Sequence, residues 1–435
     1  MTRSTRFTRL ALPFALTALL LSACAGGPSS EGPATLDPDE EITIDFSYWG
    51  NDVRAELYNQ AIDAFTEAHP NITVRTSFLA WTEYWEKRQT EAAGGGLPDV
   101  MQTDINYLRQ YAQNGLLLDL DPYLDSIIST DTIAPGVLQN GVVDGTTIGI
   151  PVSTNALGMF VNPGLQAELG IEAFDGGDWD DYESWLVDAR SAASDAGRQA
   201  WGGSNFASSL QVFEIMQRAK GEDLFTEDGE PNFTREDLAE YWSIGVPLIE
   251  DGVVTPQKRL EELLPLTAFD AAEQVSEITW DTMGAGYLAN LGEAYPELEI
   301  VAPPVTVEGA KDLYQKAGML LSGAATTDHP EAVAAFIDFM TNSPEAGAIF
   351  GTNRGIPASS SALESADITG ISAQVLEYEE SIADRLGDAP PVPTVGYGQI
   401  EQEFRTISQE IGFGTIGVDD AVERLFSEME VALQG

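Results

Sequence analysis

Residues 42–49 alternate between apolar and polar side chains, and this period of two predicts a strand with one buried face. The next segment carries apolar residues at helical spacing. Its helix should end at His69-Pro70, because proline disfavours helix in the residue before it. The pattern then predicts a strand over 72–78, a helix over about 82–93 and a strand over 99–103. This order predicts an α/β fold with parallel strands joined by right-handed crossovers.

Aromatic and polar residues stand at or just after the ends of these three expected strands. In open parallel sheets, ligands bind beyond the carboxyl ends of the strands, since the connecting loops form a crevice there. The residues concerned are Trp49, Asn51, Trp81, Tyr84 and Asp104. We therefore expect one side of a binding site at this edge of the sheet.

The rest of the chain carries weaker signals of the same kind. A short strand interrupted at Pro151 is expected within 149–161, and a helix within 178–196, where Asp180 and Glu183 have the spacing of a capping box. A strand and a glycine-rich turn are expected over 200–206. Further helices are expected at 210–220, 235–250, around 333–340 and around 418–429, and further strands at 275–280 and 299–302.

The first 23 residues have the pattern of a secretory signal. Three arginines precede an apolar run over 10–21, and this run is shorter than the roughly 20 residues that a permanent membrane span needs. The run ends in Leu21-Ser22-Ala23-Cys24, which resembles the bacterial lipobox. This resemblance implies that Cys24 is lipidated and becomes the first residue of the exported protein.

Cys24 is the only cysteine, so the fold has no internal disulfide and must be held by its core. Residues 24–41 are rich in small, polar and acidic residues, and we expect a flexible tether there. Lipid on Cys24 would anchor the protein to the outer face of the cytoplasmic membrane.

Length and charge narrow the possible functions. A chain of 435 residues is too long for one compact core, even without residues 1–23, and therefore predicts two lobes. The net charge of −49 disfavours nucleic acid and anionic lipid headgroups as partners. It also disfavours an anionic solute, unless a local cluster of basic residues overcomes the repulsion.

Several segments, in their order along the chain, resemble family 1 extracellular solute-binding proteins, the sugar-binding subunits of ATP-driven importers. The resemblance covers most of the chain from Ile42 onward. The segments are 64–72 (AFTEAHPNI), 95–100 (GGLPDV), 111–117 (YAQNGLL), 120–124 (LDPYL), 150–155 (IPVSTN), 343–346 (SPEA) and 353–357 (NRGIP). One departure is Trp280-Asp281, where the family often has Gly-x-Trp shortly after the strand, so the stacking residue from this segment stays open.

The resemblance implies a two-lobed, periplasmic-binding-protein-like (type II) fold with a hinge, and a cleft that closes on a solute. We expect an N-terminal lobe formed by 42–152 and 320–388, and a C-terminal lobe formed by 153–319 and 389–435. The expected partners are a small solute, most simply a sugar, and the membrane permease of an ABC transporter. We expect a monomer that needs no cofactor.

A sugar pocket needs aromatic platforms for C–H faces, and amide, carboxylate or guanidinium groups for hydroxyls. Besides the residues at the three strand ends, seven positions meet this need near expected hinges, turns and strand ends. They are Asn155, Asn205, Phe206, Trp280, Asp281, Arg354 and Tyr397. For each of them, packing in the core or capping of a helix or turn is an alternative role.

Two other functions stay open. One is the binding of another solute, such as a polyamine, a peptide or a polyol, and acids in the cleft would favour a cation. The other is a surface carbohydrate enzyme, because paired carboxylates can hydrolyse glycosides. The enzyme is the weaker alternative, since both histidines precede proline and the sequence lacks a serine nucleophile elbow, a phosphate loop and a zinc-ligand cluster. Residues 175–181 lack the spacing of a known calcium loop, so no metal site is expected.

Overall fold

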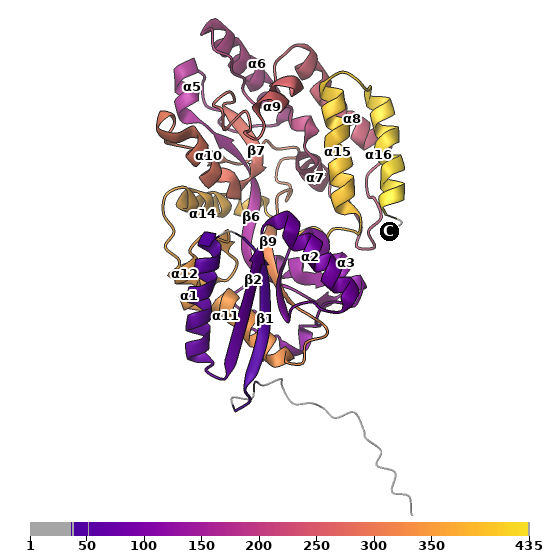
Figure 1. The fold of residues 1–435 in the computed structure, drawn as a ribbon. Helices are drawn as coiled ribbons and strands as arrows, with labels where there is room; N and C mark the ends of the chain where they lie inside the picture. Colours follow the sequence, from indigo (N-terminus) through magenta and orange to yellow (C-terminus); the bar gives the residue numbers. More distant parts are fainter. Residues whose placement is uncertain (1–35, 37–38, 51, 434–435) are drawn as a thin grey trace, which may run out of the picture. The chain divides into compact units, whose positions relative to one another are not determined.

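The computed structural model describes residue 36 and residues 39–50 and 52–433 of the chain (Figure 1). The expected signal peptide at 1–23, the expected lipidation site Cys24 and most of the expected tether at 24–41 lie outside the described residues. Asn51 lies outside them as well. The predictions for these positions stay predictions.

The first part of the chain forms the parallel sheet that its periodicity predicts. β1 pairs with β2 in parallel from Ile42 opposite Ile72 to Trp49 opposite Leu79, and β3 pairs in parallel on the other side of β1. The carboxyl ends of the three strands therefore point the same way, as expected. The elements are β1 (Ile42–Trp49), α1 (Asp52–Ala68), β2 (Ile72–Leu79), α2 (Trp81–Gly94), β3 (Val100–Thr103) and α3 (Ile105–Gln113).

Two long strands extend this sheet and carry the chain away from it. β9 (Gln315–Gly323) pairs antiparallel with β3, and β6 (Ile150–Val161) pairs antiparallel with β9. The strand order is β10-β6-β9-β3-β1-β2, in which β10 is Ile356–Pro357, and the far half of β6 pairs with β7 (Ser276–Trp280) and β8 (Glu299–Val301). The interruption expected at Pro151 is wrong. β6 runs through it, and the proline, which cannot donate to the ladder, lies at a shift of register.

Buried apolar side chains form two main cores on either side of this crossing. The first core unites β1, α1 and α11 (Pro330–Asn342), and the second unites α6 (Trp179–Asp195), α8 (Arg235–Glu250) and α16 (Val418–Ala432). β6 contributes Ile150 and Val152 to the first core and Leu157 and Met159 to the second. We call the two bodies the N-terminal and the C-terminal lobe. The residue limits predicted for the lobes stay a prediction.

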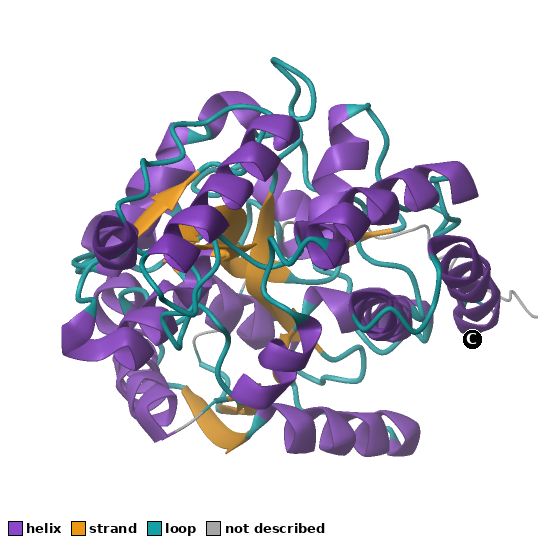
Figure 2. Cartoon of the chain, turned by 90° about the horizontal axis from the view of Figure 1, so that it is seen from above, coloured by secondary structure: helices purple, strands orange, loops and turns teal. Residues whose placement is uncertain are grey.

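The figures show how the strands and helices are distributed. In Figure 1, β6 and β9 run from the body that holds β1 and β2 toward the body that holds α6, α8 and α16. Seen from above in Figure 2, part of the sheet lies among the helices and part lies at the edge, in keeping with the largely exposed edge strand β2. The remaining longer helices are α5 (Pro163–Leu169), α7 (Leu210–Ala219), α9 (Gln257–Leu263), α10 (Gly284–Leu291), α12 (Pro344–Phe350), α14 (Ile371–Ser381) and α15 (Tyr397–Gly412).

Two local predictions in the C-terminal lobe are wrong. The capping box of α6 is formed by Asp178 and Asp181, two residues before the expected pair, because Trp179 is the first helical residue. The strand expected over 200–206 is reduced to one bridge, Trp201 to Gln274, followed by the 3₁₀ turn η3 (Phe206–Ser208). Gly202 and Gly203 lie directly against Leu186 and Tyr182 of α6, so the segment packs on a helix there.

Candidate functional site

Three recesses lie where the crossing strands meet the two lobes. We name them by one lining residue each: the Arg354 recess, the Lys316 recess and the Glu277 recess. Their volumes are about 860, 80 and 230 Å³ respectively. Between them they hold eight of the residues expected at the site, whereas Trp81, Tyr84 and Asp104 line none of the three.

The Arg354 recess gathers expected residues from four separate parts of the chain. Trp49 ends β1, Asn155 lies on β6, Asp281 follows β7 and Arg354 lies in the loop before β10. Asn155 is buried, and its Oδ1 atom has no hydrogen-bond partner in the described structure. The recess therefore combines an indole, an unused amide oxygen and ionisable groups, as a hydroxyl-rich ligand requires.

Arg354 also supports the backbone around it. Its Nη2 atom donates to the carbonyl oxygen of Met340, near the end of α11, at 2.8 Å, and its guanidinium lies 3.7 Å from the centre of the Phe350 ring. Burial lowers the pKa of Arg354. A large part of this side chain is thus engaged in holding the loop after α12.

The Lys316 recess has an aromatic wall. The ammonium of Lys316 lies 4.3 Å from the centre of the Trp280 ring, and Tyr314 meets the same ring edge-on at 6.1 Å. Tyr397, at the start of α15, completes the aromatic lining. The hydroxyl of Tyr314 donates to Glu214 Oε2 at 2.5 Å. Burial raises the pKa of Glu214, although this hydrogen bond and Arg218 act in the opposite direction.

Strand pairing places the Arg354 and Lys316 recesses next to each other. Asn155 on β6 is directly opposite Lys316 on β9, and opposed residues of an antiparallel pair project from the same face of the sheet about 5 Å apart. Likewise, Trp280 lines the Lys316 recess, and the next residue, Asp281, lines the Arg354 recess. The two recesses therefore form adjoining parts of one lined region.

The Glu277 recess extends this region into the C-terminal lobe, because it shares Gln211 and Glu401 with the Lys316 recess. Asn205 lines it, while its Oδ1 atom accepts from the backbone N–H of Ala207 and so caps η3. Phe206 is buried, and its ring lies 4.7 Å from that of Trp179. Burial raises the pKa of Glu277 to about 7.

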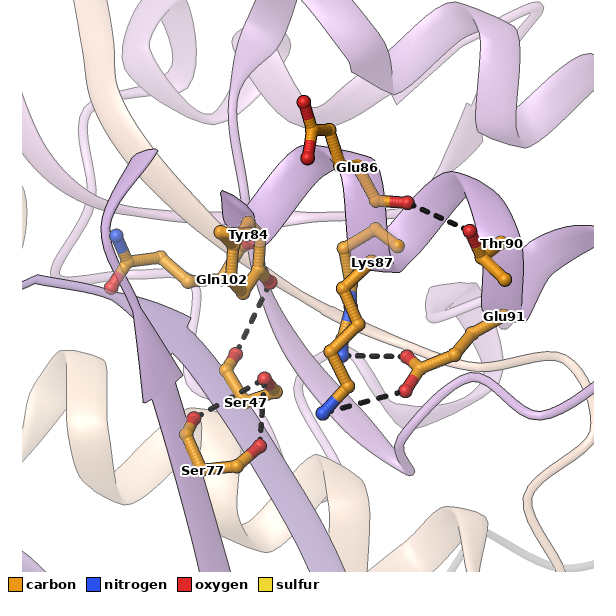
Figure 3. Close-up of polar contacts among 9 residues, drawn as sticks. Ser47, Ser77, Tyr84, Glu86, Lys87, Thr90, Glu91 and Gln102 are labelled. Carbon is orange, nitrogen blue, oxygen red and sulfur yellow. Dashed lines mark hydrogen bonds and ion pairs between the residues drawn. The ribbon is translucent and has the colours of Figure 1, made fainter. Parts of the chain in front are cut away.

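The aromatic residues around α2 differ in exposure. Trp81 is 42 % exposed and meets Trp49 edge-on at 4.8 Å. Tyr84 is completely buried, and its hydroxyl donates to the carbonyl oxygens of Gln102 at 2.7 Å and Ser47 at 3.3 Å (Figure 3). Tyr84 thus links β1 and β3 through hydrogen bonds in the interior, whereas the indole rings of Trp49 and Trp81 lie nearer the surface.

Asp104 caps α3, because its Oδ1 atom accepts from the backbone N–H of Asn106 at 2.9 Å. Desolvation raises the pKa of Asp104, and the positive charge of Lys316 opposes the shift. Asn106 itself lines the Lys316 recess. The end of β3 therefore reaches the site through the first turn of the helix that follows it.

Sequence reasoning missed several lining residues, namely Gln211, Glu214, Glu277, Lys316 and Glu401. Lys316 was missed because the strand β9 was not predicted, although Gly318 to Gly323 is mostly apolar. The carboxylates were missed because 70 acidic residues give no signal that selects among them. Within the described residues, no group of three or more metal-ligating side chains comes together.

In the part of the chain that the structure describes, no helix combines the length and the apolar character needed to cross a membrane. The comparison with protein families gives a match over residues 51–347 to the model of the bacterial extracellular solute-binding proteins. This range includes both strands that cross between the lobes, β6 and β9.

Two curated relatives illustrate the similarity in sequence. A putative binding protein of Brucella abortus is 24 % identical over 207 residues, which are 46 % of this chain and 48 % of the relative. The maltodextrin-binding protein of Bacillus subtilis is 26 % identical over 151 residues, which are 34 % of this chain and 32 % of the relative. The chain thus spans about half the length, or less, of these curated relatives.

Two solved structures match over nearly the whole chain. A family 1 extracellular solute-binding protein of Alicyclobacillus acidocaldarius has a TM-score of 0.72 at 26 % identity, covering 92 % of this chain and 100 % of the other. A periplasmic oligogalacturonide-binding protein of Yersinia enterocolitica, in complex with saturated digalacturonic acid, has a TM-score of 0.73 at 22 % identity. That match covers 90 % of this chain and 100 % of the other, and it shows a shared two-lobed fold.

Proposed function

Because the chain belongs to the family of bacterial extracellular solute-binding proteins, we propose that it captures a sugar, either a mono- or an oligosaccharide, between its lobes. The observation that carries this proposal is the adjoining pair of recesses at Asn155 and Lys316. It joins the half-buried indole rings of Trp49 and Trp280 to an amide oxygen without a partner in the described structure and to charged groups. Trp49, Trp81, Trp280 and Tyr397 would serve as stacking platforms.

The names of similar proteins support a sugar over other solutes. One relative is named for maltodextrin, and one structural neighbour holds digalacturonic acid. A neutral sugar suits this chain better than an acidic one, because the Lys316 and Glu277 recesses together contain Glu214, Glu277 and Glu401.

A cationic solute such as a polyamine is the second candidate, because three glutamates line these recesses. Two observations favour the sugar. Burial raises the pKa of Glu277 to about 7, which reduces its negative charge near neutral pH, and burial shifts the pKa of Glu214 in the same direction. The ammonium of Lys316 also lies over Trp280, the ring that a cation would otherwise approach.

The proposed mechanism is closure of the two lobes around the ligand. A ligand that touches both lobes only in the closed form shifts the population toward that form. The closed protein would then deliver the solute to the permease of an ABC importer, and the family resemblance is the support for that partner. Lipid on Cys24, as the lipobox pattern predicts, would keep the protein at the outer face of the cytoplasmic membrane.

A thermal-shift screen of the purified protein against mono- and oligosaccharides tests the proposal. A sugar at about 100 times its Kd should stabilise the folded state by about 2.7 kcal/mol and raise the Tm. Replacing Trp280 by Ala should weaken binding by about 2 kcal/mol, or roughly 30-fold in Kd, because the central platform is lost.

The matched control is Trp185→Ala, since Trp185 packs on Tyr182 in α6 and lines none of the three recesses. It should lower stability but leave the Kd for the sugar unchanged. A broad sugar panel without any shift, together with a clear shift for a polyamine, would replace the sugar by the second candidate.

A further inference from the structure

Two buried carboxyl groups meet where the chain passes between the lobes. Asp281, directly after β7, is 1 % exposed, and Glu379, on α14, is 5 % exposed. Asp281 accepts from the backbone of Ala156 and Glu379 accepts from the side chain of Thr154, two residues apart on β6, so the two carboxyls lie in the same buried place. Two negative charges there would repel each other without the screening of water, which favours a proton on one of the carboxyls.

The hydrogen bonds of the pair show which of its four oxygens already have partners. Asp281 Oδ2 accepts from the backbone N–H of Ala156 at 2.8 Å. Glu379 Oε2 accepts from Gln315 Nε2 at 2.7 Å and from Thr154 Oγ1 at 3.4 Å. The other two oxygens, Asp281 Oδ1 and Glu379 Oε1, are buried and have no hydrogen-bond partner in the described structure. A proton on either of these two atoms would displace no existing donor.

The pair connects three passages of the chain. Thr154 lies on β6 between its residues of the first core and those of the second, Ala156 is the first β6 residue of the second core, and Gln315 begins β9. Glu379 belongs to α14, which follows the passage after β10 and packs in the second core through Tyr378. Movement of one lobe against the other changes the backbone in these passages, so it must also strain or break the contacts of the pair.

The charged and titratable groups that face the pair leave it without an ionic partner among the described residues. Tyr378 uses its hydroxyl to bind the carbonyl oxygen of Leu157. Arg385 is paired with Asp312 at 2.6 Å, and Lys316 on β9 lies over Trp280. Across the Arg354 recess, Arg54 binds Asn353 and Arg354 binds Met340. A proton on one of the two carboxyls is therefore the main way in which the pair avoids two negative charges in a buried position.

We propose that Asp281 and Glu379 form a proton-dependent latch at the hinge, which holds the three passages together while it keeps its proton and releases them when the proton is lost. Asp281 lines the Arg354 recess, so its carboxyl can turn toward solvent when the second charge appears. The role of this latch in solute uptake rests on the proposed function. The latch itself can be tested without any solute.

Burial raises the pKa of both Asp281 and Glu379, and the negative charge of Glu379 raises the pKa of Asp281 further. The protonated form of the pair is therefore favoured at low pH and is lost as the pH rises. If one proton leaves for each opening, the opening equilibrium should increase by about tenfold for each pH unit above the pKa of the pair.

Hydrogen exchange of the ligand-free protein, followed by mass spectrometry from about pH 5 to about pH 9, measures this opening. After correction for the intrinsic pH dependence of exchange, protection of peptides covering 153–157 and 315–318 should fall as the pH rises. In the double variant Glu379→Gln, Asp281→Asn, protection of the same peptides should be independent of pH, because neither buried carboxyl remains.

Glu183→Gln is the control variant. Glu183 lies on α6, away from the three passages, and burial raises its pKa as well. This variant should keep the pH dependence of the wild type. The latch is wrong if the two peptides show the same pH profile in the wild type and in the double variant. That result would leave sugar binding untouched, since sugar binding is measured separately by thermal shift.

Discussion

Glu277 is a residue whose carboxyl changes charge near neutral pH. Burial raises its pKa from the ordinary 4.5 to about 7, and the hydroxyl of Ser204, 3.4 Å away, opposes the shift. Between about pH 4.5 and about pH 7, Glu277 is therefore protonated in the folded protein but ionised in the unfolded chain. This proton stabilises the folded state fully below about pH 4.5, and the stabilisation is lost as the pH rises through about 7.

The variant Glu277→Gln should therefore be more stable than the wild type at pH 8, because it removes a buried negative charge and keeps the shape of the side chain. One pKa unit corresponds to about 1.4 kcal/mol, and partial solvent access reduces the total, so we expect about 1 to 2 kcal/mol. Urea unfolding at pH 5 and pH 8 measures the difference, which should be near zero at pH 5. An equal effect of the variant at both pH values would contradict the buried charge, and the exposed Glu430→Gln serves as the control.

At the scale of elements, α12 approaches the next helix more closely than any side chain would allow. A Cβ atom at Gly347 would lie 2.2 Å from the carbonyl oxygen of Ala362 in α13 (Ser360–Ser365). Backbone atoms cannot move aside as the end of a side chain can. The contact matters for the site, because Phe350 at the end of α12 lies under Arg354 and lines the same recess.

Replacing Gly347 by Ala should therefore destabilise the protein by about 1 to 3 kcal/mol, the usual cost of overpacking, despite the better helix propensity of Ala. Thermal unfolding measures the loss. Gly286 in α10 is the matched control, because a Cβ atom there would meet nothing within 4 Å. Gly286→Ala should stabilise by about 0.5 to 1 kcal/mol. Equal effects of the two substitutions would show that α12 and α13 can separate without cost.

At the scale of the whole molecule, the net charge of −49 acts against the compact state through self-repulsion. Local ion pairs neutralise part of it, for example Arg259 with Glu273 and Arg385 with Asp312, both at 2.6 Å. Such pairs cannot cancel the net negative charge, because the chain has 70 acidic residues and only 21 basic ones. The long-range repulsion that remains depends on the ionic strength.

Adding salt should consequently raise the Tm, because the screening length falls from about 30 Å at 0.01 M to about 3 Å at 1 M. A series of melts in NaCl at pH 8 measures the slope. The same series at pH 4 is the control: protonation of many carboxylates reduces the net charge, so the slope should be smaller there. A Tm that falls with salt at pH 8 would mean that the ion pairs outweigh the repulsion.

The sequence by itself determined the first half of the N-terminal lobe and the family. Period-two and helical spacing depend only on neighbouring residues, so β1, α1, β2, α2 and β3 appear within one or two residues of their predicted limits, with the predicted parallel pairing. The match over residues 51–347 likewise confirms the family that the ordered segments indicated. The helices expected around 333–340 and around 418–429 are also confirmed, as α11 and α16.

Only the tertiary structure decided which side chains come together. Trp81 and Tyr84 lie three residues apart, yet one is exposed and the other buried, because the orientation of α2 on the sheet depends on residues distant in sequence. Lys316 meets Trp280, and Asp281 meets Glu379, through long-range pairing of strands and packing of α14. Such contacts join positions dozens of residues apart, and no local periodicity carries information about them.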